Sequence, residues 1–224
     1  MPAFHLTRSK AAFLTAVPLA WAVLLWFHPA VDRNDVYEDL RDDGATYLIV
    51  HVGTLIFIGL MGVALFMLVR DVPGKAARFS RLAIGPFVLL YGAWEAVIGL
   101  AIGALVQHAN DAPAGQRPAV SDAIQSLGSN VIVGDPGIVG SLGALAWIAA
   151  VIAAAVGIRG AGAPMPATVL LGLSLIVVSH PPPIGPVGLA CFAGAVVALY
   201  RNQRVLARRT GHAQSPTPTP AATG

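Results

Sequence analysis

The sequence has few charged residues and a single cysteine. Asp, Glu, Lys and Arg make up only 11% of the 224 residues, whereas about 25% is usual for soluble domains, and apolar residues make up 56%. So little charge cannot cover a water-facing surface, which excludes a soluble enzyme, and the apolar content excludes a disordered chain. The one cysteine, Cys191, excludes an internal disulfide, a Cys-x-x-Cys redox pair and a cysteine-rich metal site.

The sequence also lacks motifs that would identify a reaction. It contains no glycine-rich phosphate loop, no serine-nucleophile pattern, no paired-carboxylate signature and no His-Glu-x-x-His sequence. In composition it resembles the small, Ala- and Gly-rich multipass proteins of bacteria, which implies a location in the inner (cell) membrane. Whether the chain is an enzyme is left open by the sequence.

Apolar residues fall in six runs, at about 11–28, 47–69, 82–106, 136–158, 167–179 and 187–200. Four of the runs have close to the length of about 20 residues that crosses a bilayer as a helix. The sequence therefore predicts an all-α integral membrane protein, with six transmembrane helices arranged as three helical hairpins in one domain, 1–209. The last two runs are short and flank a proline-rich turn, which predicts a broken fifth and sixth helix pair. Residues 210–224, rich in Pro, Thr and Ala, are predicted to form a disordered cytoplasmic tail.

The basic residues predict the orientation of these helices. Eleven of the 14 Lys and Arg residues lie in the N-terminal segment, the second and fourth connections, and the tail. The other three lie in the first and third connections, the first of which also holds six acidic residues at 32–43. Since Lys and Arg concentrate on the cytoplasmic side, both termini are predicted to be cytoplasmic. The net charge of +3 then reflects the orientation of the helices in the membrane. The expected partner is therefore the lipid bilayer and not nucleic acid. A homo-oligomer or a larger membrane complex is left open.

Glu95 is the residue least expected in a membrane. It lies 14 residues after Arg81, which places it about 21 Å along the helix and near mid-membrane. Carboxylates at this depth are costly and usually face other helices or a water-filled cavity. Tyr91 and Gly99 share its helix face, and Gly99 belongs to a stripe of small residues that predicts close helix packing. We interpret Glu95 as part of a substrate or proton site, or alternatively as a neutral packing residue.

His180 lies at the expected depth of Glu95, so the two could meet in the bundle core. It lies 14 residues after Pro166, the expected start of the fifth helix, and so at about the depth of Glu95. The following Pro181 forces His180 out of helical geometry, as in the interrupted helices of transporter binding sites. The substrate or proton site is therefore predicted to contain Glu95, His180 and Tyr91. The alternative for His180 is a capping residue in a tight surface turn.

His28 and His51 are predicted to form a second polar layer nearer the outer face. Counting from Lys10 and Arg70, both lie about 27 to 29 Å from the inner side, on adjacent antiparallel helices. Two facing imidazoles could bind a transition metal or haem, and a set of His, Glu and His suits zinc, copper or iron. Two interfacial histidines without a ligand are the alternative.

Three other residues are assigned structural roles. Asp135 precedes Pro136 just before the fourth run, a pattern typical of an N-cap followed by the first helical residue. Tyr47 fits the outer aromatic belt, and Trp94 fits a deeper packing position.

Three functions are compatible with these residues. The first is the transport or binding of a proton, metal ion or small solute at a Glu/His polar centre that is open to the extracytoplasmic side. The second is a membrane redox or enzyme protein that binds haem or a metal through its histidines. The third is a structural or accessory subunit in which the buried polar groups only fix helix register.

Overall fold

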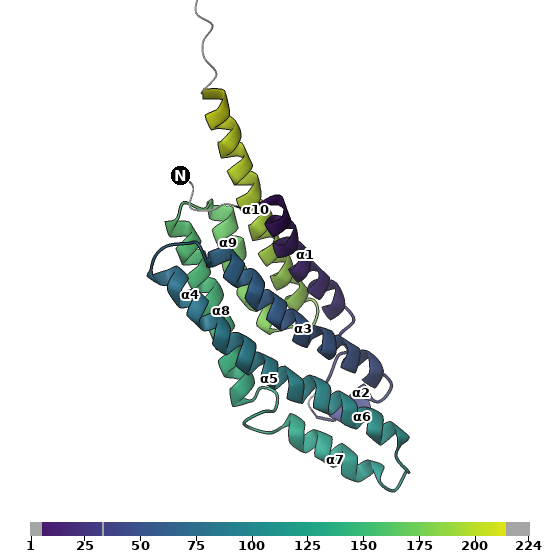
Figure 1. The fold of residues 1–224 in the computed structure, drawn as a ribbon. Coiled ribbons are helices and arrows are strands. Elements are labelled where there is room, and N and C mark those ends of the chain that lie inside the picture. Colours follow the sequence, from purple (N-terminus) through teal and green to yellow (C-terminus); the bar gives the residue numbers. More distant parts are fainter. Residues whose placement is uncertain (1–5, 33, 214–224) are drawn as a thin grey trace, which may run out of the picture.

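The computed structural model describes residues 6–32 and 34–213, and in this part of the chain all regular elements are helices (Figure 1). In chain order they are α1 (Arg8–Leu25), α2 (Val36–Leu40), α3 (Gly44–Val69), α4 (Lys75–Pro86), η1 (Phe87–Tyr91), α5 (Gly92–Glu95), η2 (Ala96–Ala101), α6 (Ile102–Asp111), α7 (Arg117–Gly128), α8 (Ile138–Gly160), α9 (Met165–Leu173), η3 (Ser174–Val178) and α10 (Ile184–Ala213).

The all-α architecture is confirmed, and five helical segments are long and apolar enough to cross a membrane. These are Arg8–Leu25, Gly44–Val69, Lys75–Asp111, Ile138–Gly160 and Ile184–Arg208. A sixth apolar segment, Met165–Val178, is shorter. The length and composition of these helices indicate a membrane protein.

The segment from Lys75 to Asp111 is one continuous helical path that widens into π-helical winding at two places. The α-helix α4 passes into the π-helical turn η1, returns to α-helical winding over the four residues of α5, and widens again in η2 before α6. Such π-helical insertions within α-helices are frequent at functional sites. Here they flank the short stretch that carries Trp94 and Glu95.

The last two elements differ from the predicted pair of short helices. The helix α9 tightens into the 3₁₀ turn η3, and together they cover only Met165–Val178. The helix α10 spans Ile184–Ala213 and so continues well past residue 200, because the residues that follow are mostly Arg, Gln, Leu and Ala, which are good helix formers. It includes residues 210–213 of the predicted disordered tail. Residues 214–224 of that tail lie outside the described residues.

The start of α8 also differs from the prediction. The helix begins at Ile138, and its N-cap is Gly137, without a side-chain hydrogen bond. The prediction that Asp135 caps this helix is therefore corrected. Asp135 lies in the preceding loop, where its backbone N–H donates to the carbonyl of Gly128 at 2.8 Å, and such turn hydrogen bonds delay the start of the helix.

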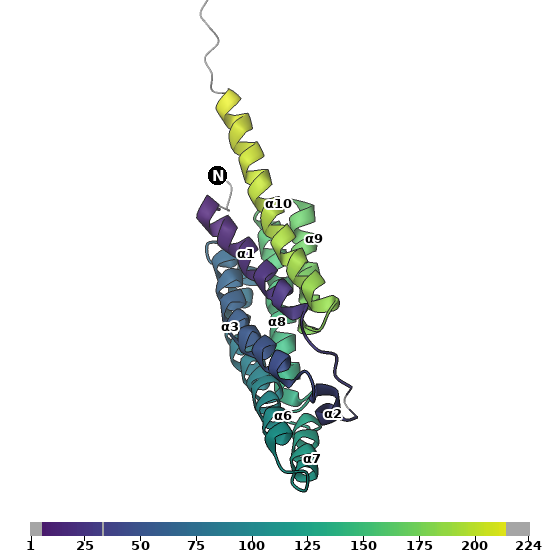
Figure 2. The same ribbon diagram turned by 90° about the vertical axis from the view of Figure 1, so that its right-hand side faces the viewer.

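Neighbouring helices pack closely through glycine. The helix α1 lies beside α3 and α10, α4 lies beside α8, and α9 lies beside α10 (Figure 1, Figure 2). A Cβ at Gly143 of α8 would overlap the backbone of Tyr91, and one at Gly140 would overlap the ring of Trp94. The start of α1 and the C-terminal part of α10 lie at one end of the bundle, whereas α2 and α7 lie at the other (Figure 1).

Candidate metal centre

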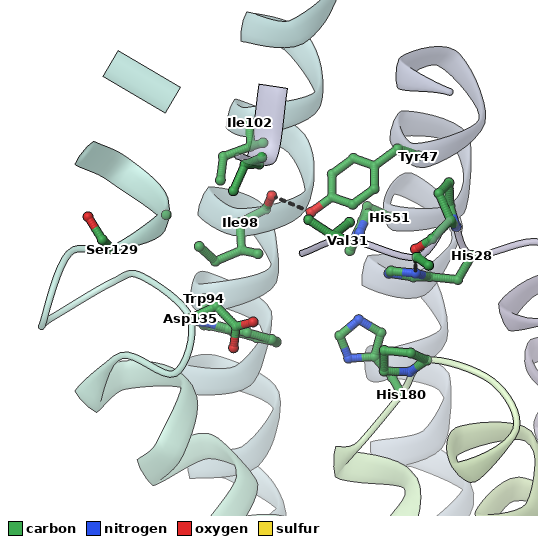
Figure 3. A pocket seen from close by; sticks show the side chains of 15 residues that line it. His28, Val31, Tyr47, His51, Trp94, Ile98, Ile102, Ser129, Asp135 and His180 are labelled. Carbon is green, nitrogen blue, oxygen red and sulfur yellow. Dashed lines mark hydrogen bonds between the residues drawn. The ribbon is translucent and has the colours of Figure 1, made fainter. Parts of the chain in front are cut away.

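Three histidines from different parts of the chain meet inside the bundle. His28 follows the end of α1, His51 lies in α3, and His180 lies between η3 and α10. The ring centroids of His28 and His51 are 5.0 Å apart, those of His28 and His180 are 5.0 Å apart, and those of His51 and His180 are 5.8 Å apart (Figure 3). One ring nitrogen from each residue lies within 4.8 Å of the other two.

Each imidazole is held by a hydrogen bond at its Nδ1 atom. His28 Nδ1 bonds to the carbonyl oxygen of Pro29 at 2.7 Å. His51 Nδ1 bonds to Oε1 of Glu95. His180 Nδ1 lies 3.2 Å from the hydroxyl oxygen of Tyr91, and that hydroxyl donates to the carbonyl of Val178 at 3.1 Å.

These partners favour a proton on Nδ1 of each ring. A backbone carbonyl only accepts, so the proton of His28 lies on Nδ1. The Tyr91 hydroxyl uses its proton on Val178, so it accepts from Nδ1 of His180. An ionised Glu95 accepts from Nδ1 of His51 in the same way. The Nε2 atom of all three rings then carries a lone pair.

The Nε2 atoms of His28 and His51 are buried and have no hydrogen-bond partner among the described residues. An orphaned acceptor of this kind is unfavourable unless a ligand satisfies it. Burial, together with the proximity of His51, also lowers the pKa of His28, which lies beyond the end of the first span, to about 4. His28 is therefore neutral at pH 7, the form that binds metals.

The carboxyl group of Glu95 lies directly behind the centre. The residue is 0% exposed, and its second oxygen, Oε2, has no hydrogen-bond partner in the described part of the chain. The approach of α3 to this helix depends on Gly99, because a Cβ there would overlap the ring of His51. Tyr47 completes the wall: its ring centroid is 4.0 Å from that of His51, and its hydroxyl donates to the carbonyl of Ile98 at 2.9 Å.

A cavity of about 530 Å³ adjoins the three imidazoles. Asp135 and Trp94 lie on the side of it opposite His28, and Trp94 Nε1 donates to the carbonyl of Gly134 at 2.8 Å, which ties the Asp135 loop to the helix (Figure 3). The cavity lies toward the end of the bundle that carries α2 and α7. Its lining consists of His28, Pro29, Ala30, Val31, Val36, Tyr47, His51, Trp94, Ile98, Ile102, Gly128, Ser129, Asp135, His180 and Pro181.

The structure brings the sequence-predicted residues into one cluster, but with different partners. Glu95 bonds to His51 instead of His180, and His180 bonds to Tyr91. The two predicted layers merge in part because η3 is a 3₁₀ turn, which rises about 2.0 Å per residue instead of 1.5 Å and so carries His180 further along the bundle. Gly99 lets α3 approach closely enough for His51 to reach Glu95. Residue depth along a single helix does not reveal such an approach between two helices.

Sequence reasoning missed two residues of the site. Tyr47, assigned to the aromatic belt, lines the cavity and packs on His51. Its position four residues before His51 on one helix is the signal that places both on the same face. Trp94, assigned to packing, also lines the cavity, and its place next to Glu95 is its only signal in the sequence.

Comparison of the chain with protein-family models, with curated proteins and with solved structures gave no match. Three imidazoles with one ring nitrogen each within 4.8 Å of the others, and each with a hydrogen bond at Nδ1, resemble the arrangement of metal-binding histidines.

Proposed function

We propose that this chain is a six-span membrane protein that binds a transition-metal ion through His28, His51 and His180. The observation that carries the proposal is the pattern of hydrogen bonds: all three Nδ1 atoms have a partner, and the buried Nε2 atoms of His28 and His51 have none among the described residues. Metal-binding histidines nearly always pair their second nitrogen with a carboxylate, a carbonyl or another polar group. The partners here are of these kinds.

The donor set defines the class of metal. Neutral imidazole suits zinc, copper, iron and nickel, and nothing in the set favours the hard cations that prefer oxygen. Zinc binds imidazole at about 2.0–2.1 Å, so tetrahedral ligand nitrogens lie about 3.4 Å apart. The three nitrogens lie within 4.8 Å of one another, so small inward movements of the rings would complete the site.

Three protein ligands leave a fourth coordination position open. Open positions of this kind are typical of zinc sites that bind or activate a small ligand, whereas structural zinc sites have four protein ligands. The cavity of about 530 Å³ beside the imidazoles provides room for such a ligand. The lining is mostly apolar apart from the histidines, Tyr47, Ser129 and Asp135, so it suits a small molecule with an apolar body and one donor atom.

A single ion fits the cluster better than haem does. Two histidines that ligate one haem stand on opposite faces of the porphyrin, which must lie between them. Here the rings of His28 and His51 are 5.0 Å apart, and the ring of His180 lies within 5.8 Å of both. A porphyrin between any two of the rings would overlap the third.

The surroundings favour a bound ion over a transported one. On the inner side of the cluster, the Phe87 ring packs on Tyr91 at 5.7 Å and on Trp147 at 4.7 Å between centroids. These three side chains are buried and offer no ligand except the Tyr91 hydroxyl, which is already bonded. A cation leaving the histidines toward this layer would lose its ligands, so we favour a resident ion over the transport hypothesis.

Six spans with both termini in the cytoplasm fit the arrangement of the helices. The segment Met165–Val178 joins the five longer ones as the short fifth span, and an even number of crossings puts both ends of the chain on one side. Figure 1 places the start of α1 and the C-terminal part of α10 at the same end of the bundle. Because most Lys and Arg residues lie at this end, it faces the cytoplasm of the inner (cell) membrane, and the metal centre opens outward.

Metal analysis of the purified protein tests the proposal. The full chain is expressed in cells replete with zinc, copper and iron, purified in detergent, and its metal content is measured by mass spectrometry. We expect about one transition-metal ion per chain, and loss of that ion in His51→Ala and His180→Ala. The exposed His108 provides the matched control, because His108→Ala removes an imidazole away from the centre. Metal-free wild-type protein, or equal metal content in His51→Ala, would contradict the proposal.

A further inference from the structure

A second cavity lies between α1 and α10, at the end of the bundle opposite the metal centre. This α1–α10 groove has a volume of about 390 Å³. Its lining comes from both helices: Arg8, Ala11, Ala12, Thr15, Val197, Tyr200, Arg201 and Arg204. It shares no residue with the cavity at the histidines.

The charged groups of the α1–α10 groove are all positive. Arg8, Arg201 and Arg204 line it, and no acidic residue does. Neither Arg8 nor Arg201 has an ion-pair partner among the described residues, and the guanidinium of Arg204 lies 5.8 Å from the ring centroid of Tyr200. Three exposed guanidinium groups in a groove that no acidic residue lines attract an anion.

The groove changes from charged to apolar along its length. On each helix the lining residues are spaced at i, i+3, i+4 and i+7, so each set forms one continuous face. Seven residues separate Arg8 from Thr15, which corresponds to about 10 Å along the helix. Over this distance the lining passes from guanidinium groups to Ala11, Ala12 and Val197, whose small side chains leave the space open.

We propose that the α1–α10 groove binds one anionic phospholipid of the cytoplasmic leaflet. The three guanidinium groups hold the lipid phosphate, because arginine donates paired hydrogen bonds that match phosphate oxygens. The first part of an acyl chain lies against the apolar half of the groove. Basic pockets between helices on the cytoplasmic side are a known form of lipid recognition. The proposal does not depend on the metal centre.

Native mass spectrometry of the detergent-purified full chain tests this site. The protein is titrated with phosphatidylglycerol and with phosphatidylethanolamine of the same acyl chains, and inorganic phosphate is added as a competitor in a separate arm. The test variant is Arg201→Gln/Arg204→Gln. The matched control is Lys75→Gln/Arg78→Gln, which removes the same charge from exposed residues of α4 near the same end of the bundle.

We expect wild type and the Lys75/Arg78 control to bind phosphatidylglycerol at least tenfold more tightly than phosphatidylethanolamine, and the Arg201/Arg204 variant to lose this preference. Equal binding of the two lipids by wild type, or equal loss in both variants, overturns the proposal. Displacement of the lipid by millimolar inorganic phosphate also overturns it, because the ligand would then be a phosphate group alone.

A second variant keeps the test decisive if the double arginine variant does not fold. Thr15→Phe leaves all three arginines in place and fills the apolar half of the groove. We expect weaker phosphatidylglycerol binding and an unchanged melting temperature. Wild-type lipid affinity in a folded Thr15→Phe protein would show that the acyl chain does not lie in the groove.

Discussion

The substitution Gly99→Ala tests whether the position of the His51 ring defines the metal centre. Gly99 lies in η2 and faces α3, where an added Cβ would overlap Cβ, Cγ and Nδ1 of His51. These atoms are at the start of the His51 side chain, so the overlap cannot be relieved by moving the end of a flexible side chain. The ring must therefore move as a whole, or the two helices must separate.

The required movement is large compared with the tolerance of a metal site. Carbon atoms in favourable contact are about 3.5–4.0 Å apart, so the ring must retreat by about 1 Å. Metal–ligand distances in a formed site vary by only about 0.2 Å from their preferred values. We expect metal affinity to fall at least tenfold, which is about 1.4 kcal/mol, and the overpacked protein to lose about 1–3 kcal/mol of stability.

Metal competition with a chromophoric chelator measures the affinity, and thermal unfolding in detergent measures the stability. Gly92→Ala is the matched control in the same helical segment, since its added Cβ would only touch Leu55 Cδ1 at 3.7 Å, an ordinary contact. It should keep wild-type affinity and be as stable as wild type or slightly more so. A folded Gly99→Ala protein that binds metal as tightly as wild type would refute the reasoning.

Two further substitutions test the metal centre, and reporter fusions test the topology. Glu95→Gln keeps the shape of the side chain but removes the charge behind His51, so metal affinity should fall about 10- to 100-fold in the same competition assay, and an unchanged affinity would remove Glu95 from the centre. Tyr91→Phe deletes the hydroxyl that orients His180, so we expect metal affinity to fall. The lost hydrogen bond should also lower the free energy of unfolding by about 1 kcal/mol, measured as a lower melting temperature. A change in the melting temperature alone would indicate a packing role for Tyr91. Reporter domains fused after Arg159 and after the last span should both be cytoplasmic, and an extracytoplasmic signal at either point would contradict the six-span topology.

The helical fold could be predicted from the sequence because membrane helices are encoded locally. Each long apolar run became a helix, and the run that starts at residue 136 differs only in its first residues. The ends of the helices were harder to predict, because they depend on turns that compete with the helix and on the helix propensity of residues outside the apolar runs. The backbone bond from Asp135 to Gly128 delays α8, whereas good helix formers carry α10 to Ala213.

The identity of the polar residues could be predicted, but their pairing could not. Glu95, His28, His51 and His180 stand out because polar groups are costly inside a membrane. Which of them touch depends on how closely two helices approach, and therefore on single glycines such as Gly99. It also depends on local winding, which sequence periodicity does not report.

The burial of Glu95 itself argues for an ion at the histidines. A carboxyl group with 0% exposure and one oxygen without a partner among the described residues is unfavourable on its own. Among the described residues its hydrogen-bond partner is His51, a neutral imidazole when Nε2 carries a lone pair. A cation bound at that Nε2 would provide the missing positive charge, transmitted through the ring to the proton on Nδ1. A bound cation would therefore stabilise the ionised form of Glu95 at this buried position. Its hydrogen-bond partner, His51, would then be a metal ligand.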